Sequence, residues 1–334
     1  MALGFTLFGC SGRYEGPESD HFNGKIFFDP QGFQLKTFGQ FLKWQLGESK
    51  TPWPVWVENK TRPEILKDID RGRANVVFVN HATVLIQLPG INILTDPVWS
   101  DRVSPVSWAG PKRVRSPGLL FENLPKIDIV MISHNHYDHL DLPTLVRLKE
   151  SHDPRFFVPL GDDAILKSVG ISKVTSMDWW QEVDLGPSLK LNFTPAKHWS
   201  GRGFYDRNAS LWGAYLIRNS GHNIYFAGDT GMGSHFAAVQ KQFGDIDVAF
   251  LPIGAYEPRW FMRDSHMNPE DAVLAHQALK AKLSVAIHFG TWQLTNEGMD
   301  APRLGLDVAL LSAGISKDQF VALETGQSMG VTFR

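Results

Sequence analysis

The sequence predicts an α/β fold in which two mixed β-sheets pack face to face and helices cover both outer surfaces, an αββα sandwich. From residue 76 onward, short β-branched runs alternate with helix-like stretches. An internal repeat is the second indication: residues 83–96 are echoed by residues 212–229, and each segment reads as a hairpin that ends in an aspartate. Because these two similar halves follow each other without a Pro/Gly-rich linker, we expect a single domain over residues 76–334.

The expected strands are short apolar runs bounded by turn residues. They cover residues 76–79, 83–86, 91–94, 127–132, 189–197, 224–228, 246–251 and 283–287. Helices are expected over residues 142–150, 164–169, 269–282 and 302–313. The third of these has a clear start, because Asn268 can cap it, Pro269 suits its first turn, and Glu270 and Asp271 follow near its positive end.

Residues 1–75 form an aromatic-rich extension with little clean periodicity. Its rings are Phe27, Phe28, Phe33, Phe38, Phe41, Trp44, Trp53 and Trp56. Two interpretations stay open for it: the extension wraps the main domain and buries these rings, or it offers an apolar surface that docks on lipid.

Composition excludes several classes of protein. The chain has 334 residues with 33 basic and 35 acidic side chains, a net charge of −2, which argues against a general nucleic-acid binder. No apolar run reaches the roughly 18 residues that a membrane-spanning helix needs. The one cysteine, Cys10, cannot form an internal disulfide.

A dense group of metal-ligand residues directly follows the apolar run 127–132. The segment Ser133-His-Asn-His-Tyr-Asp-His139 holds three histidines and an aspartate. In an extended turn, His134 and His136 point the same way, while Asp138 and His139 reach a second point nearby. Imidazole and carboxylate groups suit zinc and its neighbours in the first-row series.

Three further ligand types stand at the ends of other expected strands. His198 follows the strand with the proline exit, Asp229 closes the run 224–228, and His288 closes the run 283–287. Each taken alone is better explained as a cap or a packed core residue. Together with the first cluster they make seven ligands, enough for two metal ions that share one carboxylate.

These motifs resemble the metallo-β-lactamase superfamily. The pattern is His-x-His-x-Asp-His, a lone His, Gly-Asp-Thr and a late His. Longer stretches are similar to one branch, the N-acylphosphatidylethanolamine-hydrolysing phospholipase D family. They are residues 80–84, 110–117, 133–141, 226–231 and 252–262. The resemblance covers roughly residues 75–330.

The resemblance implies a role for each ligand. One metal ion would be held by His134, His136 and His198. A second would be held by Asp138, His139 and His288, with Asp229 bridging the two. The implied cofactors are two Zn²⁺ ions, with other first-row divalent metals as alternatives. Tyr137 and His266 match positions that contact the phospholipid, and Asp138 and His266 are the expected catalytic residues.

The expected reaction is phosphodiester hydrolysis. Two cations sharing a carboxylate would lower the pKa of a bridging water, and the resulting hydroxide would attack phosphorus while the ions neutralise the developing charge. N-Acylphosphatidylethanolamine would yield an N-acylethanolamine and phosphatidic acid. His266 would bind the substrate phosphate or protonate the leaving group; the alternative is a histidine at a helix start that faces solvent.

Supporting roles are predicted for a few further residues. Asp96, at the repeat position matching Asp229, would orient a ligand histidine, or would serve only as a turn residue. His81 would either support a ligand or be merely packed. Lys112, Arg113 and Arg115 form a local basic cluster that would contact anionic headgroups, or be solvated.

Other functions stay open at this stage. The same metal pair would cleave a lactone or an ester as readily, and a non-enzymatic, lipid-anchored metal-binding protein is a third reading. An RNA phosphodiesterase is disfavoured by the balanced charge. The expected partners are the phospholipid, a membrane surface, no nucleic acid and, as one option, a second copy of the chain. We expect peripheral membrane association, or a bacterial lipoprotein anchored through Cys10, which follows Leu-Phe-Gly.

Overall fold

The computed structural model describes residues 12–32, 36–47, 49–203 and 205–333. Two predictions, the lipid anchor at Cys10 and the packing of Phe33, therefore lie outside the described residues. Within them, no helix has both the length and the apolar character needed to cross a membrane.

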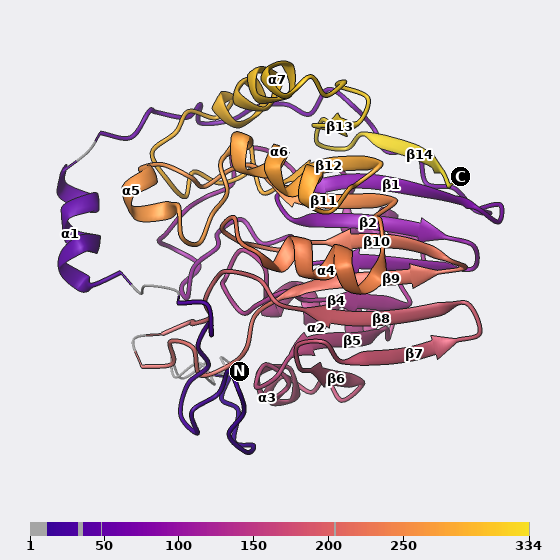
Figure 1. The fold of residues 1–334 in the computed structure, drawn as a ribbon, viewed down its shortest axis with the longest axis horizontal. Helices are drawn as coiled ribbons and strands as arrows, with labels where there is room; N and C mark the ends of the chain where they lie inside the picture. Colours follow the sequence, from indigo (N-terminus) through magenta and orange to yellow (C-terminus); the bar gives the residue numbers. More distant parts are fainter. Residues whose placement is uncertain (1–11, 33–35, 48, 204, 334) are drawn as a thin grey trace, which may run out of the picture.

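Two seven-stranded mixed sheets form the centre of the molecule (Figure 1). The first sheet has the order β14-β1-β2-β3-β4-β5-β6 and the second β13-β12-β11-β10-β9-β8-β7. The first sheet consists of β1 (Arg73–Asn80), β2 (Thr83–Leu88), β3 (Ile91–Thr95), β4 (Ile129–Met131), β5 (Arg155–Pro159), β6 (Val174–Met177) and β14 (Ser328–Thr332). The second consists of β7 (Glu182–Gly186), β8 (Leu189–Thr194), β9 (Ala214–Asn219), β10 (His222–Phe226), β11 (Val248–Pro252), β12 (Leu283–Ile287) and β13 (Phe320–Val321).

Helices lie around the two sheets. They are α1 (Phe38–Gly47), α2 (Leu142–Ser151), α3 (Asp163–Ser168), α4 (His235–Phe243), α5 (Arg259–Met262), α6 (Pro269–Ala278) and α7 (Ala301–Ala313), with a 3₁₀ turn at Phe121–Asn123. In Figure 1, α4 and α6 lie over the second sheet, and α6 packs against β11 and α7. Leu145 and Leu148 of α2 join an apolar cluster on the first sheet. The arrangement confirms the predicted αββα sandwich.

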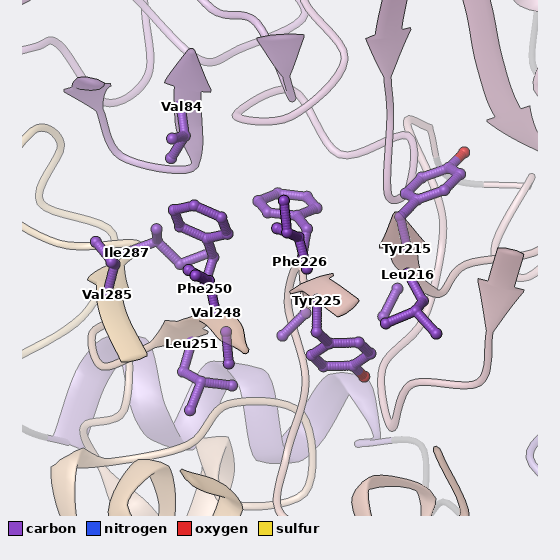
Figure 2. Packing of buried hydrophobic residues seen from close by; sticks show 14 of the residues in the cluster. Val84, Tyr215, Leu216, Tyr225, Phe226, Val248, Phe250, Leu251, Val285 and Ile287 are labelled. Carbon is purple, nitrogen blue, oxygen red and sulfur yellow. The ribbon is translucent and has the colours of Figure 1, made fainter. Parts of the chain in front are cut away.

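The apolar core lies between the two sheets and continues under the helices. In β1, Val76 and Phe78 belong to the cluster between the sheets, whereas Val77 and Val79 face the outer cluster. This alternation follows from the two-residue period of a strand, and it leaves both faces apolar because both are covered. Figure 2 shows the same division in the second sheet, where Phe226 and Phe250 point toward Val84 of the first sheet while Tyr225 and Leu251 point the opposite way.

Some element boundaries differ from the prediction. The helix expected over 269–282 ends at Ala278, because Lys280 takes a positive φ of 46° and β12 starts soon after. The strand expected over 127–132 pairs only through Ile129–Met131. Helices α1, α4 and α5 were not predicted, and neither was the strand β14 that closes the first sheet beside β1.

The extension contacts the main body along much of its described length. Phe22 and Phe27 are part of the core between the sheets. The indole of Trp44 in α1 donates to Asn296 Oδ1 (3.0 Å), and that of Trp53 donates to the Glu297 carbonyl (2.8 Å). The extension therefore buries some of its rings, while Phe38, at 74% exposure, stays in solvent.

Candidate metal centre

The metal-ligand residues follow strands that all run in one direction. Strands β3 and β4 are parallel, as are β10, β11 and β12, so within each sheet their carboxyl ends lie at one edge. The carboxyl end of β4 leads to His134, His136, Asp138 and His139, that of β8 to His198, that of β10 to Asp229 and that of β12 to His288. The structure brings all seven side chains together, although His134 and His288 are 154 positions apart in the sequence.

Three ring nitrogens form a first ligand group. His134 Nε2 lies 2.8 Å from His136 Nδ1, which in turn lies 3.3 Å from His198 Nε2. Two nitrogens bound tetrahedrally to one zinc ion at about 2.0–2.1 Å are about 3.3 Å apart. The three nitrogens are therefore spaced like ligands of a single ion.

Asp138, His139 and His288 form a second ligand group. Asp138 Oδ2 lies 3.4 Å from both His139 Nε2 and His288 Nε2. Asp229 lies between the groups: its Oδ2 is 3.3 Å from His139 Nε2, and its Oδ1 is 3.1 Å from His288 Nε2. The same Oδ2 is 3.8 Å from His198 Nε2 of the first group. Asp229 is thus the carboxylate in reach of both groups.

Hydrogen bonds behind the rings fix which nitrogen faces the centre. His139 Nδ1 donates to Asp96 Oδ2 (2.6 Å), because a carboxylate can only accept, and His198 Nδ1 donates to the Ser265 carbonyl (2.9 Å). Their Nε2 lone pairs therefore point to the cluster. Ser133 donates to both oxygens of Asp96, from its amide (2.7 Å) and its hydroxyl (2.6 Å). This geometry agrees with the hypothesis that Asp96 orients a ligand histidine.

The donor atoms fit divalent ions. Among the described residues, the buried atoms without a hydrogen-bond partner include His139 Nε2, His288 Nε2 and Asp229 Oδ1, which face one another. Buried polar atoms are rarely left unpaired in folded proteins, so a set that converges on one place indicates a bound group. Imidazole nitrogens and carboxylate oxygens are the ligands that zinc and similar divalent metals take.

Electrostatics keep the first group ready to bind a cation. Burial lowers the pKa of His136 and of His198 to about 3, so both rings are neutral at physiological pH. Burial also lowers the pKa of His134, with His139 and His136 adding to the effect. Neutral imidazole is the form that ligates a metal.

In the second group the pKa values of the histidine rings are raised instead of lowered, because carboxylates surround these rings. Burial lowers the pKa of His288, but Asp229 and Asp138 outweigh it and raise that pKa to about 9. Burial also lowers the pKa of His139, but the same carboxylates raise it more strongly, so this pKa lies well above its usual value. Burial raises the pKa of Asp229, yet His139 and His288 hold it well below the usual range. A divalent cation would take the place of these shared protons.

Three of the nine described non-glycine residues with a positive φ lie at the same place. His81, Asp96 and His288 have φ angles of 46°, 33° and 62°, in the left-handed region that non-glycine residues avoid. Each such residue costs about 1–3 kcal/mol and persists only where surrounding contacts enforce it. Strained residues of this kind cluster at functional sites, which supports the assignment of this edge as the site.

A cavity of about 520 Å³, here called the groove, opens over the centre. His136, Asp138, Asp229 and His266 contribute to its lining. The remaining lining is largely aromatic and comes from α1, α5 and the loop after β8: Phe38, Phe41, Trp44, Trp199 and Phe261, with Met262 beside them. Figure 1 shows α1 and α5 together, beyond the ends of the strands. The groove is therefore charged at its base and largely apolar on its walls, to which Lys36 and Arg207 add two basic side chains.

His266 and Tyr137 lie differently with respect to this groove. His266 is turned inward: its Nδ1 is 3.8 Å from Asp229 Oδ2, and its ring packs edge-on against His198 at 5.1 Å. Tyr137 does not line the groove. Its hydroxyl donates to the Arg202 carbonyl (3.0 Å), and the Arg202 guanidinium lies 3.9 Å from the centre of its ring. The substrate contact predicted for Tyr137 stays a prediction.

The basic cluster of the sequence divides in the structure. Arg113 and Arg115 are both buried, so the expectation that they contact lipid headgroups is wrong. Arg113 instead donates to the Ser100 carbonyl (3.0 Å), and its guanidinium lies 4.8 Å from the centre of the Trp292 ring. A short run of basic residues in the sequence does not reveal which of them the fold encloses.

Several groove residues were missed in the sequence. Trp199 packs edge-on against His136 at 4.1 Å, and Arg207 lies 4.5 Å from the Trp199 ring centre. The position of Trp199 directly after His198 was an available signal. No local pattern marks a role for Arg207. The α1 rings were noted in the aromatic-rich extension and the α5 residues lie in the stretch 252–262, but only packing brings them to the groove.

Sequence comparisons identify relatives of this chain. A family profile described as "Beta-lactamase superfamily domain" matches residues 91–289. The chain is 35% identical over 328 residues to "N-acyl-phosphatidylethanolamine-hydrolyzing phospholipase D 1" of Caenorhabditis elegans, covering 91% of this chain and 92% of that protein. It is 41% identical over 230 residues to the uncharacterized protein Rv0906 of Mycobacterium tuberculosis, covering 67% of this chain and 61% of that one.

Solved structures share the fold at low sequence identity. Igni18, a metallo hydrolase from Ignicoccus hospitalis, has a TM-score of 0.61 and 21% identity, covering 78% of this chain and 100% of its own. The isothiocyanate hydrolase from Delia radicum gut bacteria has a TM-score of 0.63 and 19% identity, covering 77% and 99%. At these identities the likeness shows the common fold alone.

Proposed function

The chain belongs to the N-acylphosphatidylethanolamine-hydrolysing phospholipase D family of the β-lactamase superfamily, and we propose that it cleaves N-acylphosphatidylethanolamine using two divalent metal ions. It is a metal-dependent hydrolase. Water would add to phosphorus and the ethanolamine oxygen would leave, which yields an N-acylethanolamine and phosphatidic acid. The observation that carries the proposal is the convergence of seven ligand side chains at the base of an aromatic groove.

The chain offers a separate set of ligands for each ion. His134, His136 and His198 would hold the first ion, and Asp138, His139 and His288 the second, with Asp229 shared. When bound, two divalent ions sharing a carboxylate activate water and neutralise charge on phosphoryl oxygens. We favour zinc, because nitrogen donors predominate in both groups.

His266 is suited to contact the phosphodiester. It lines the groove beside Asp229, and Arg259 Nη1 donates to its carbonyl (2.9 Å), which holds its backbone in place. An imidazole at this point would donate a hydrogen bond to a phosphoryl or leaving-group oxygen. This position supports the substrate-binding role and leaves the solvent-facing alternative without support.

The groove walls suit the acyl chains of a lipid. Phe38 and Phe41 line the groove and are also exposed on the outer side of α1, together with Leu42 and Leu46. A lipid entering from a membrane surface would pass from apolar surface to apolar wall without crossing water. We therefore propose that α1 contacts the membrane at the mouth of the groove.

The decisive experiment is hydrolysis by purified, zinc-loaded protein. N-Acylphosphatidylethanolamine, phosphatidylcholine, an acyl-homoserine lactone and a simple acyl ester would be compared, each with a metal-free control. We expect zinc-dependent release of N-acylethanolamine at a rate well above that of the other substrates. Cleavage of the lactone or ester alone would replace the proposal with the carbonyl-hydrolase alternative, and no turnover with two ions bound would favour a binding protein.

His266→Ala, which removes the ring donor, tests the contact with the phosphodiester. Loss of one positioned donor typically lowers kcat by about 100–1,000-fold, while the metal content should stay at the native value. Unchanged turnover of the diester would remove His266 from the site.

Membrane contact is tested with the double variant Leu42→Ser/Leu46→Ser, because both residues are exposed on α1 and neither lines the groove. The matched control is Leu311→Ser on α7, because Leu311 is 82% exposed, close to the 84% of Leu46. We expect the double variant to sediment less with phosphatidylethanolamine vesicles, while its hydrolysis of detergent-dispersed substrate is kept. Equal loss of vesicle binding in the control would show that α1 has no special part.

A further inference from the structure

His81 is a buried histidine that the proposed ligand sets do not use. It occupies the turn between β1 and β2, directly after the carboxyl end of β1, and is 2% exposed. Its φ of 46° lies in the left-handed region. Its amide donates to Thr291 Oγ1 (3.1 Å), so the strained backbone is held from the segment that follows β12.

His81 contacts two members of the second ligand group. Its Nε2 lies 3.0 Å from Asp138 Oδ2. Its carbonyl accepts a hydrogen bond from the His288 amide (2.7 Å), and its ring centre is 3.9 Å from that of His288. One residue of the first sheet thus touches a ligand from each sheet.

We propose that His81 is a positioning residue that holds Asp138 and His288 in the geometry the second metal ion needs. The inference rests on the proposed two-ion site. The 3.0 Å contact between His81 Nε2 and Asp138 Oδ2 is at hydrogen-bond distance, and we assign the hydrogen to Nε2 because an ionised carboxylate only accepts. That nitrogen then has no lone pair for a metal, which separates His81 from the ligands themselves.

The side chains of Arg113 and Trp292 form a row that ends at His81. The Trp292 ring packs edge-on against His81 at a centroid distance of 5.2 Å. Arg113 covers Trp292 and also donates to the carbonyls of Ser100 (3.0 Å) and Val98 (3.3 Å). Two sequence motifs that the ligand sets leave unexplained, residues 80–84 and 110–117, are joined in this row.

Two substitutions separate the hydrogen bond from the packing. His81→Phe keeps a ring against His288 but removes the donor to Asp138, whereas His81→Gln keeps a donor of similar reach. His276→Phe is the matched control, because His276 is also buried, at 5% exposure, and bonds Ser284 Oγ (2.8 Å) outside the ligand groups.

The readouts are metal binding and the spectrum of the bound metal. Zinc stoichiometry would be measured after dialysis, the affinity of each ion by competition with a chromogenic chelator, and the ligand geometry by the visible absorption of the cobalt-substituted protein. We expect His81→Phe to weaken one of the two ions by about 10–100-fold, as loss of a partner behind a ligand typically does. His81→Gln should recover most of that affinity with a native-like cobalt spectrum, and His276→Phe should bind both ions normally.

Three outcomes would overturn the inference. Native affinity for both ions in His81→Phe would show that His81 only packs. Equal loss of an ion in both His81 variants, with a changed cobalt spectrum in His81→Gln, would make His81 a ligand. A loss in His276→Phe equal to that in His81→Phe would indicate a general effect of destabilisation. If the unaltered protein itself binds fewer than two ions, the proposed two-ion site fails first, and the measurement distinguishes the two failures.

Discussion

The two halves of the molecule are alike at one end of their sheets and different at the other. At the amino end of the parallel strands, Asp128 Oδ2 accepts from the Asn92 amide (2.9 Å), and Asp247 Oδ2 accepts from the Asn223 amide (2.8 Å). The reverse backbone bonds also match: the Asp128 amide donates to the Asn92 carbonyl (3.0 Å), and the Asp247 amide to the Asn223 carbonyl (2.9 Å).

The carboxyl ends of the same strands diverge. Asp96 follows β3 directly and turns back to bond Ser133 and His139. The second half reaches its aspartate two residues further along, through Gly228, whose φ is 58°. A Cβ at Gly228 would lie 2.5 Å from that of Ser133, so only glycine lets the chain pass here and deliver Asp229 to the ligand groups.

The comparison of the two halves shows that the same type of hairpin can carry an aspartate with either of two roles. The amino ends join neighbouring strands in the same way in both halves, which is a structural requirement of each sheet. At the carboxyl ends, the second half has two extra residues before its aspartate. Asp229 therefore reaches both ligand groups, whereas Asp96 only supports a ligand. Substitutions at matched positions should therefore have unequal effects at one end and similar effects at the other.

Asp229→Asn should have the largest effect. An amide in place of the shared carboxylate removes a negative charge from both ligand groups, so we expect metal content to fall and kcat/KM to drop by more than about 100-fold. Metal analysis and hydrolysis of the phospholipid would measure this. Retention of both ions with native turnover would end the claim that the two aspartates have diverged.

Asp96→Asn should cost less, because this residue acts through His139. An amide oxygen can still accept from the ring but without the charge, so metal affinity should fall by about 10–100-fold and activity should recover at higher zinc. Asp247→Asn serves as the control with a buried aspartate far from the ligands. A loss as severe as that of Asp229→Asn would make the two positions equivalent.

Asp128→Asn and Asp247→Asn should both reduce stability without changing the site. Each carboxylate accepts a charge-assisted hydrogen bond, and the loss is expected to be about 1.5–3 kcal/mol in the free energy of unfolding. Chemical denaturation of the two variants, with zinc content measured in parallel, checks this. Loss of an ion in either variant would mean that the amino ends are not purely structural.

The smallest effect is expected outside both halves, at the attachment of the extension. The His21 ring bonds Asp178 (2.8 Å) and Asp20 (2.6 Å); burial lowers its pKa, but the two acids raise it above the usual value. Because the folded pKa is the higher one, this stabilisation is present below about pH 6.5 and is lost as the pH rises through the folded pKa.

The difference in unfolding free energy between the native protein and His21→Gln should therefore shrink from pH 5.5 to pH 8.5, by about 1 kcal/mol or less because the acids are partly solvated. The Asp128→Asn and Asp247→Asn variants are the controls, because neither substitution removes a histidine whose pKa is raised. A difference that is constant with pH would show that the His21 contact is not charged.

The fold was predictable because its evidence is local and repeated. Strands that are apolar on both faces, such as β1 and β4, can lie only inside a covered sheet, and the repeat of residues 83–96 indicated two such sheets. Boundaries were less accurate where a local turn of the backbone ends an element early, as it does after Ala278. The α1 helix was missed because its apolar residues mostly line the groove or are exposed instead of packing in the core, and α5 has only four residues.

The candidate site was predictable to a similar degree. The seven ligand types stand out because each follows an apolar strand, and strand ends of one direction meet at one edge of a sheet. The prediction that Arg113 and Arg115 contact headgroups was wrong, because charged residues are usually exposed but the fold buries both of these. The rings of α1 were noted as part of an aromatic-rich extension, but no local pattern indicated that they line a groove beside the metal-ligand residues.

The sequence by itself determined the sheet sandwich, the hairpin repeat and the seven candidate metal-ligand side chains, since periodicity and strand ends are properties of short segments. The tertiary structure alone decided which nitrogen of His139 and His198 faces the centre, how closely Asp229 approaches each ligand group, and that His81 touches Asp138 and His288. These depend on how the edges of two separate sheets approach each other. That approach is set by side chains distant in sequence filling the space between the sheets.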